Sequence, residues 1–163
     1  MHKSPVCIHI HKASHHFSAA HFTILSATRR ERLHGHNYQV SANIESTVGK
    51  SGLCFEYNKA KNAIQRLCTE LDESVLMPTN SPHLKTERTD QQARIRFGGD
   101  EFVFPASDVT FLPISNITVE ALAAWFLGRL KDIPEISKLP ISAMTVTVSS
   151  GESEHASVTW SLP

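Results

Sequence analysis

The sequence predicts an α+β protein in which an antiparallel sheet carries two helices on one face. Apolar residues alternate with polar ones in several short segments, as in half-buried strands, and recur at helical spacing in two longer segments. Consecutive strands joined by short turns favour antiparallel pairing, and both helices then cover the same face of the sheet. The 163 residues match the size of one domain, so residues 1–163 are expected to form a single domain.

The first half of the chain is expected to supply strands and then a helix. Residues 6–11 and 37–45 are predicted strands, and apolar and polar residues alternate throughout the second of them. Residues 49–52 indicate a turn that leads into a short returning strand over residues 53–57. Helical spacing follows and predicts one apolar helix face, made of Ala60, Ala63, Ile64, Leu67, Cys68 and Leu71.

The second half is expected to add a hairpin, a helix and two strands. Residues 94–104 predict a hairpin that turns at its paired glycines. A helix follows with Asn116 or Thr118 as its N-cap, and its apolar positions are Val119, Leu122, Ala123, Phe126, Leu127 and Leu130. Strands over residues 144–148 and 156–160 complete an open four-stranded sheet. Because such a sheet has two free edges, self-association is expected.

Composition excludes several classes of function. The chain has 16 basic and 16 acidic side chains, so it lacks the excess positive charge of a nucleic-acid or membrane-surface protein. No apolar run approaches the roughly 20 residues that span a bilayer, and residues 1–10 lack the apolar core of a signal peptide. With three widely spaced cysteines, a disulfide framework is not expected. These features predict a reduced, cytoplasmic protein.

Three of the ten histidines form the strongest motif. His34 and His36 begin a predicted strand, where residues i and i+2 point to the same side, and Gly35 leaves room between them. With His21 they would form a three-histidine zinc site whose fourth position is open, as in catalytic rather than structural zinc. An isolated His-x-His is more often a polar surface pair, and His9 and His11 exemplify that alternative.

These histidine motifs carry a family resemblance. The segments FSAAH (residues 17–21) and LHGHNY (residues 33–38), taken together, resemble the 6-pyruvoyl-tetrahydropterin synthase and 6-carboxytetrahydropterin synthase family. The resemblance continues through residues 52–61, 71–72 and 116–120. It implies a tunnelling fold, in which the subunits of a homo-oligomer close into a barrel, as trimers or stacked hexamers. It also implies a small pterin-like substrate and zinc on His21, His34 and His36.

One departure from the family pattern points to the reaction. The usual synthases have a reactive cysteine before His-Gly-His, whereas this chain has Glu31, similar to a third class that cleaves 7,8-dihydroneopterin triphosphate to 6-hydroxymethyl-7,8-dihydropterin. The resemblance implies that Glu31 moves protons beside zinc, that Asp72 is also catalytic and that Thr118 contacts the substrate. Alternatively, Glu31 is a solvated charge among Arg29, Arg30 and Arg32, which are themselves either solvated or phosphate contacts.

Two other departures leave alternatives open. Glu73 replaces the histidine of the family's proton relay, and Ser150 stands where a glutamate grips the pterin. Glu152 shares strand parity with Ser150, so a shifted register or a bulge would restore that anchor. The alternatives are a 6-carboxytetrahydropterin synthase-like enzyme of deazapurine (queuosine) synthesis, and a non-catalytic homologue that binds zinc or a ligand. The missing loop cysteine counts against the first alternative.

Overall fold

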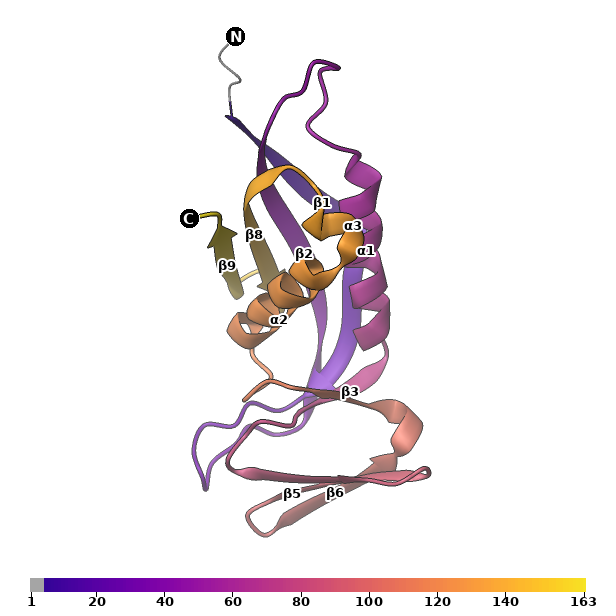
Figure 1. The fold of residues 1–163 in the computed structure, drawn as a ribbon. Coiled ribbons are helices and arrows are strands. Elements are labelled where there is room, and N and C mark those ends of the chain that lie inside the picture. Colours follow the sequence, from indigo (N-terminus) through magenta and orange to yellow (C-terminus); the bar gives the residue numbers. More distant parts are fainter. Residues whose placement is uncertain (1–4) are drawn as a thin grey trace.

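The computed structural model describes residues 5–163 as one long sheet with helices on one face and a smaller sheet at one end (Figure 1). Residues 1–4, part of the segment expected to lack a signal peptide, lie outside the described residues. The elements are β1 (Pro5–His21), β2 (His34–Thr47), α1 (Tyr57–Leu71), β3 (Ser74–Pro78), β4 (Leu84–Arg88), β5 (Gln92–Phe97), β6 (Asp100–Pro105), η1 (Ala106–Asp108), β7 (Val109–Leu112), α2 (Val119–Asp132), α3 (Pro134–Ser137), β8 (Ile141–Ser149) and β9 (His155–Ser161).

The main sheet has six strands in the order β7-β3-β1-β2-β8-β9. In this sheet β1 pairs with β2, β2 with β8, and β8 with β9, all antiparallel. On the other side of β1, β3 pairs with β1, and β7 with β3, in parallel. The α+β class is therefore confirmed, whereas the prediction of four strands, all antiparallel, is wrong. The reason lies in α1, which returns the chain from the far end of β2 to the end of β1, so that β3 runs in the direction of β1.

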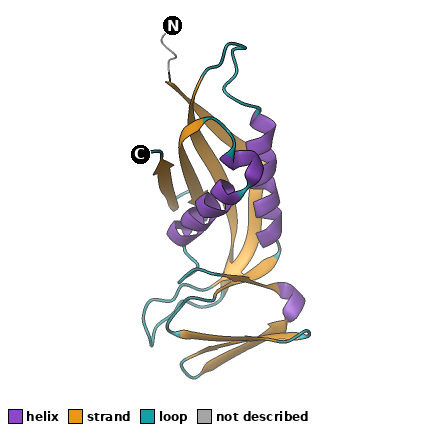
Figure 2. Cartoon of the chain, viewed as in Figure 1, coloured by secondary structure: helices purple, strands orange, loops and turns teal. Residues whose placement is uncertain are grey.

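Both long helices pack on the same face of the main sheet, as predicted (Figure 2). Their apolar stripes meet the inward residues of the sheet strands in the larger of two hydrophobic clusters. Thr118 is the N-cap of α2, because its hydroxyl accepts from the backbone N–H of Ala121 at 3.2 Å. No helix within residues 5–163 is both long enough and apolar enough to cross a membrane.

The strand predicted over residues 53–57 is wrong. Those residues follow the predicted glycine turn, in which the backbone N–H of Gly49 donates to the carbonyl of Leu53 at 2.9 Å, and α1 then begins at Tyr57. Phe55 is buried and its ring meets the ring of Tyr57 edge-on at 5.5 Å. The segment is therefore a loop that packs Phe55 into the core and leaves Leu53 exposed.

The predicted hairpin forms β5 and β6 of a second, three-stranded sheet, which we call the small sheet (β4–β6). The hairpin turns at Gly98 and Gly99, and Gly98 has φ +56°, a conformation that favours glycine in a two-residue turn. The small sheet packs on the second hydrophobic cluster, which also receives Phe22 and Ile24 from the segment after β1. This sheet therefore lies against the chain that leads from His21 to His34.

Candidate metal centre and the Glu31 loop

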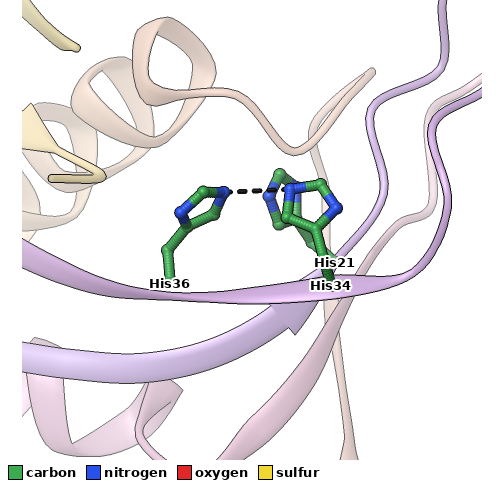
Figure 3. A group of neighbouring side chains, drawn as sticks. All are labelled: His21, His34 and His36. Atoms are coloured by element: carbon green, nitrogen blue, oxygen red, sulfur yellow. Dashed lines mark hydrogen bonds between the residues drawn. The ribbon is translucent and has the colours of Figure 1, made fainter. Parts of the chain in front are cut away.

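The three predicted ligands lie together where β1 ends and β2 begins (Figure 3). His21 is the last residue of β1 and pairs with His34, the first residue of β2, while His36 follows on the same side of the strand. One ring nitrogen from each histidine lies within 4.8 Å of those of the other two. The pairing of two strands therefore brings residues 13 positions apart to one point.

Backbone carbonyls orient two of these rings for metal binding. The Nδ1 of His21 lies 3.0 Å from the carbonyl oxygen of Ile117, and the Nδ1 of His34 lies 2.7 Å from that of Arg32. Because a carbonyl oxygen only accepts, each Nδ1 carries the proton and each Nε2 presents a lone pair. Such outer partners typically fix the tautomer and the orientation of histidine ligands in metal sites.

The free nitrogens fit a divalent cation. The Nε2 of His21 is buried without a hydrogen-bond partner among residues 5–163, and the Nε2 atoms of His34 and His36 face each other at 2.9 Å. A cation between the rings would satisfy all three lone pairs. Burial, followed by His34 and His36, lowers the pKa of His21 to about 4, so this ring stays neutral, as a metal ligand must be.

Glu31 lies beside this cluster. Its Oε2 is 3.9 Å from Nε2 of His34 and accepts from the backbone N–H of Thr23 at 3.3 Å. Hydrogen bonding to the Thr23 side chain is the largest cause of a lowered Glu31 pKa, and the backbone N–H of Thr23, then His34 and His21, lower it further. The carboxylate is 44% exposed, so a ligand can reach it. The structure thus brings Glu31 together with the three histidines.

The segment that carries Glu31 is folded tightly. In this segment, which we call the Glu31 loop (residues 22–33), Ile24 forms a bridge with Arg30, and the backbone N–H of Glu31 donates to the Thr23 carbonyl at 2.9 Å. Asn116 accepts from the N–H of Ile24 at 3.0 Å and donates to its carbonyl at 2.8 Å. Asn116, a candidate N-cap by sequence, therefore holds this loop instead. Its position before α2 in the sequence did not reveal that role, because Ile24 is 92 residues away.

Asp72 and Glu73 lie at the end of α1. An Asp72 carboxylate oxygen accepts from the N–H of Ser18 at 2.7 Å, and the N–H of Glu73 donates to the carbonyl of Ser18 at 2.7 Å. Glu73 has φ +55°, which is unusual for a residue other than glycine. The two residues thus hold β1 three positions before His21. The catalytic role expected for Asp72 stays a prediction.

The two predicted substrate contacts lie in different settings. The Thr118 hydroxyl caps α2, one residue after Ile117, whose carbonyl bonds His21. Glu152 lies in the exposed turn between β8 and β9. The bulge expected to return Glu152 to the strand is absent from the described ladder, because β8 and β9 pair in unbroken register up to Ser149 and His155. Both substrate roles stay predictions.

Fold and site together define the class: an α+β protein with three convergent histidines and an adjacent carboxylate. A family model described as 6-pyruvoyl tetrahydropterin synthase matches residues 9–161. The chain therefore belongs to the 6-pyruvoyl tetrahydropterin synthase family, as its motifs predicted.

Relatives agree with this assignment. A protein of Methanocaldococcus jannaschii with the provisional name 6-carboxy-5,6,7,8-tetrahydropterin synthase is 29% identical over 117 residues, 71% of each chain. The 6-pyruvoyl tetrahydropterin synthase of Plasmodium vivax superposes with a TM-score of 0.90 at 26% identity, covering 98% of this chain and 99% of the other. That of Plasmodium falciparum has the same TM-score and coverage at 27% identity. Two P. vivax variants replace a glutamate described as a catalytic residue with cysteine or alanine.

Proposed function

We propose that this protein is a zinc-dependent lyase that cleaves the C6 side chain of 7,8-dihydroneopterin triphosphate to give 6-hydroxymethyl-7,8-dihydropterin. The observation that carries the proposal is the Glu31 carboxylate, 3.9 Å from the ligand nitrogen of His34 in a site of three histidines. A glutamate is also described as a catalytic residue in the P. vivax relative, which supports a catalytic role for this residue type. His21, His34 and His36 would hold the zinc through their Nε2 atoms.

Glu31 has the protonation state that a general base needs. Its lowered pKa keeps it ionised at neutral pH, and its Oε2 is fixed by the backbone N–H of Thr23. Bound zinc would supply electrostatic polarisation of the side-chain hydroxyls, which lowers their pKa. Glu31 then takes a hydroxyl proton, the carbon that bore the hydroxyl becomes a carbonyl as the adjacent C–C bond breaks, and the electron pair enters the pterin ring. A proton returned to the ring-bound carbon completes the cleavage.

Two other functions remain in competition. The names of the curated relatives favour a 6-carboxytetrahydropterin synthase, but residues 22–33 contain no cysteine. Glu73 in place of the relay histidine, and Ser150 in place of the anchoring glutamate, favour a zinc- or ligand-binding protein without catalysis. The cytoplasmic location and the homo-oligomer of three or six chains stay predictions alongside each function.

The test is to incubate the zinc-loaded protein with 7,8-dihydroneopterin triphosphate and to identify the product. We expect 6-hydroxymethyl-7,8-dihydropterin from the wild type, and about 10²- to 10⁴-fold lower turnover from Glu31→Gln with its zinc retained. The amide keeps the size of the side chain but cannot accept a proton. Unchanged turnover in this variant would contradict the role of Glu31. A carboxytetrahydropterin product, or binding of the pterin without any product, would favour one of the competing functions.

A further inference from the structure

Arg30 is the one side chain that joins the Glu31 loop to the small sheet through a polar contact in the described structure. One terminal nitrogen of its guanidinium lies 2.5 Å from a carboxylate oxygen of Asp100, the first residue of β6. The other terminal nitrogen donates to the carbonyl oxygen of Glu31 at 2.9 Å. The same planar group therefore touches the small sheet on one side and the Glu31 backbone on the other.

Aromatic rings hold this guanidinium in place. Its central carbon lies 4.7 Å from the ring centre of Phe102, 5.1 Å from that of Phe22 and 6.0 Å from that of Phe97. The Arg30 side chain is only 17% exposed, and its Nε is buried without a hydrogen-bond partner among residues 5–163. A guanidinium is planar, so it stacks on rings and holds its donors in a fixed fork, whereas a lysine ammonium is a compact charge without that planar geometry.

We infer that Arg30 is a positioning residue, through which the small sheet fixes Glu31 against the histidine site. This inference rests on the proposed function, because it assumes that Glu31 moves protons. Asn116 holds the loop at Ile24 from the α2 side, and Arg30 holds it at Glu31 from the side of the small sheet. Since rates of proton transfer depend on fixed geometry, a loosened Glu31 carboxylate lowers turnover more than it lowers binding.

The inference differs from the alternative that Arg30 binds the substrate's phosphates. Both terminal nitrogens of Arg30 already have protein acceptors, and the rings of Phe22 and Phe102 lie against the group. A phosphate contact would strengthen binding of substrate and transition state alike, so its loss would raise KM and leave kcat unchanged. Loss of a positioning contact would lower kcat. The two roles therefore separate in steady-state kinetics.

The experiment measures kcat, KM and zinc content with 7,8-dihydroneopterin triphosphate for Arg30→Lys, alone and combined with Glu31→Gln. We expect Arg30→Lys to lower kcat about 10- to 100-fold, with zinc retained and KM within about 2-fold of wild type. In the Glu31→Gln background the same exchange should change kcat by less than about 2-fold, because no carboxylate remains to be positioned. Arg94→Lys is the matched control, since Arg94 pairs with Glu101 in the same sheet at 2.8 Å, and it should keep wild-type kcat.

Two results would overturn the inference while the proposed function stands: a raised KM with normal kcat, or an equal loss in both backgrounds. If Arg30→Lys does not fold, Asp100→Asn tests the same link, because it weakens the ion pair and leaves the rings in place. We expect Asp100→Asn to lower kcat about 3- to 10-fold, again only when Glu31 is present. An unchanged kcat would overturn the inference. A wild-type rate in Glu31→Gln alone would instead contradict the proposed function, and the inference with it.

Discussion

At the scale of single residues, the site depends on proton positions that backbone groups impose. Two carbonyls direct the protons of His21 and His34 to Nδ1, and their Nε2 atoms are left to face the same point as His36. Spacing along the sequence predicted which histidines meet, because residues i and i+2 of a strand share a side. It could not predict the contact between His21 and the Ile117 carbonyl, since the two residues are 96 positions apart.

Removing one ligand should release the metal. We expect wild-type protein to bind one zinc per chain. His36→Ala removes a ligand itself, so it should weaken zinc binding by more than the roughly 10- to 100-fold that is typical when a residue hydrogen-bonded to a ligand is replaced. Metal analysis after dialysis against zinc buffers measures this loss. His9→Ala is the control, because His9 is exposed and bonded to Asn43 at 2.8 Å, away from the cluster. Full zinc occupancy without all three histidines would refute the assignment.

The metal-free protein should lose stability in mild acid. Burial holds the pKa of His21 at about 4 in the folded state, against about 6.5 in an unfolded chain, so folding disfavours the protonated ring. This contribution is fully present above pH 6.5 and is lost as the pH falls towards 4, by an amount on the order of 2–3 kcal/mol. Urea unfolding of the metal-free protein at pH 7 and pH 5 measures it.

The control for this pH dependence is His21→Gln. This variant has no ring to protonate, so the difference in unfolding free energy between pH 7 and pH 5 should shrink. A difference as large in His21→Gln as in the wild type would show that another group is responsible. His15, which is also buried with a lowered pKa, is the residue that such a result would indicate.

At the scale of elements, periodicity predicted the two long helices and the hairpin, and it failed for the four-residue helix α3 and where strands are short. Both helices carry apolar stripes long enough to reveal their period, and paired glycines marked the hairpin turn. The strands β3, β4 and β7 have four or five residues each, too few for alternation to be recognised. Parallel pairing of β3 and β7 depends on contacts between distant segments, which no local pattern contains.

Variants of Thr118, the N-cap of α2, distinguish a structural role of this residue from a contact with the substrate. Thr118→Ala removes the acceptor for the N–H of Ala121 and should lower the free energy of unfolding by about 1 kcal/mol. Thr118→Ser keeps an acceptor and should restore most of that loss. Urea unfolding measures both variants, while KM for the pterin in the same proteins tests the contact. An unfolding free energy unchanged in Thr118→Ala would contradict the capping role.

At the scale of the whole molecule, the strands at the two ends of the main sheet, β7 and β9, each have an edge that no strand within residues 5–163 pairs with. Backbone groups along an open edge can pair with another chain, so we expect the protein to form a homo-oligomer of three or six chains. Light scattering coupled to size-exclusion chromatography measures the mass directly. A monomer at micromolar concentration would contradict this expectation. The single chain already assembles the three histidines and Glu31, so the metal site itself is expected to persist in dilute protein.

The central claim is that Glu31 and the three histidines act on one ligand, and a crystal structure of the zinc-loaded protein with 7,8-dihydroneopterin bound tests it most directly. We expect zinc about 2.0–2.1 Å from Nε2 of His21, His34 and His36. The hydroxyls of the C6 side chain should occupy the open position, with the Glu31 carboxylate about 2.6–3.2 Å from one of them. Zinc held by other residues, or a pterin whose side chain points away from Glu31, would contradict the account.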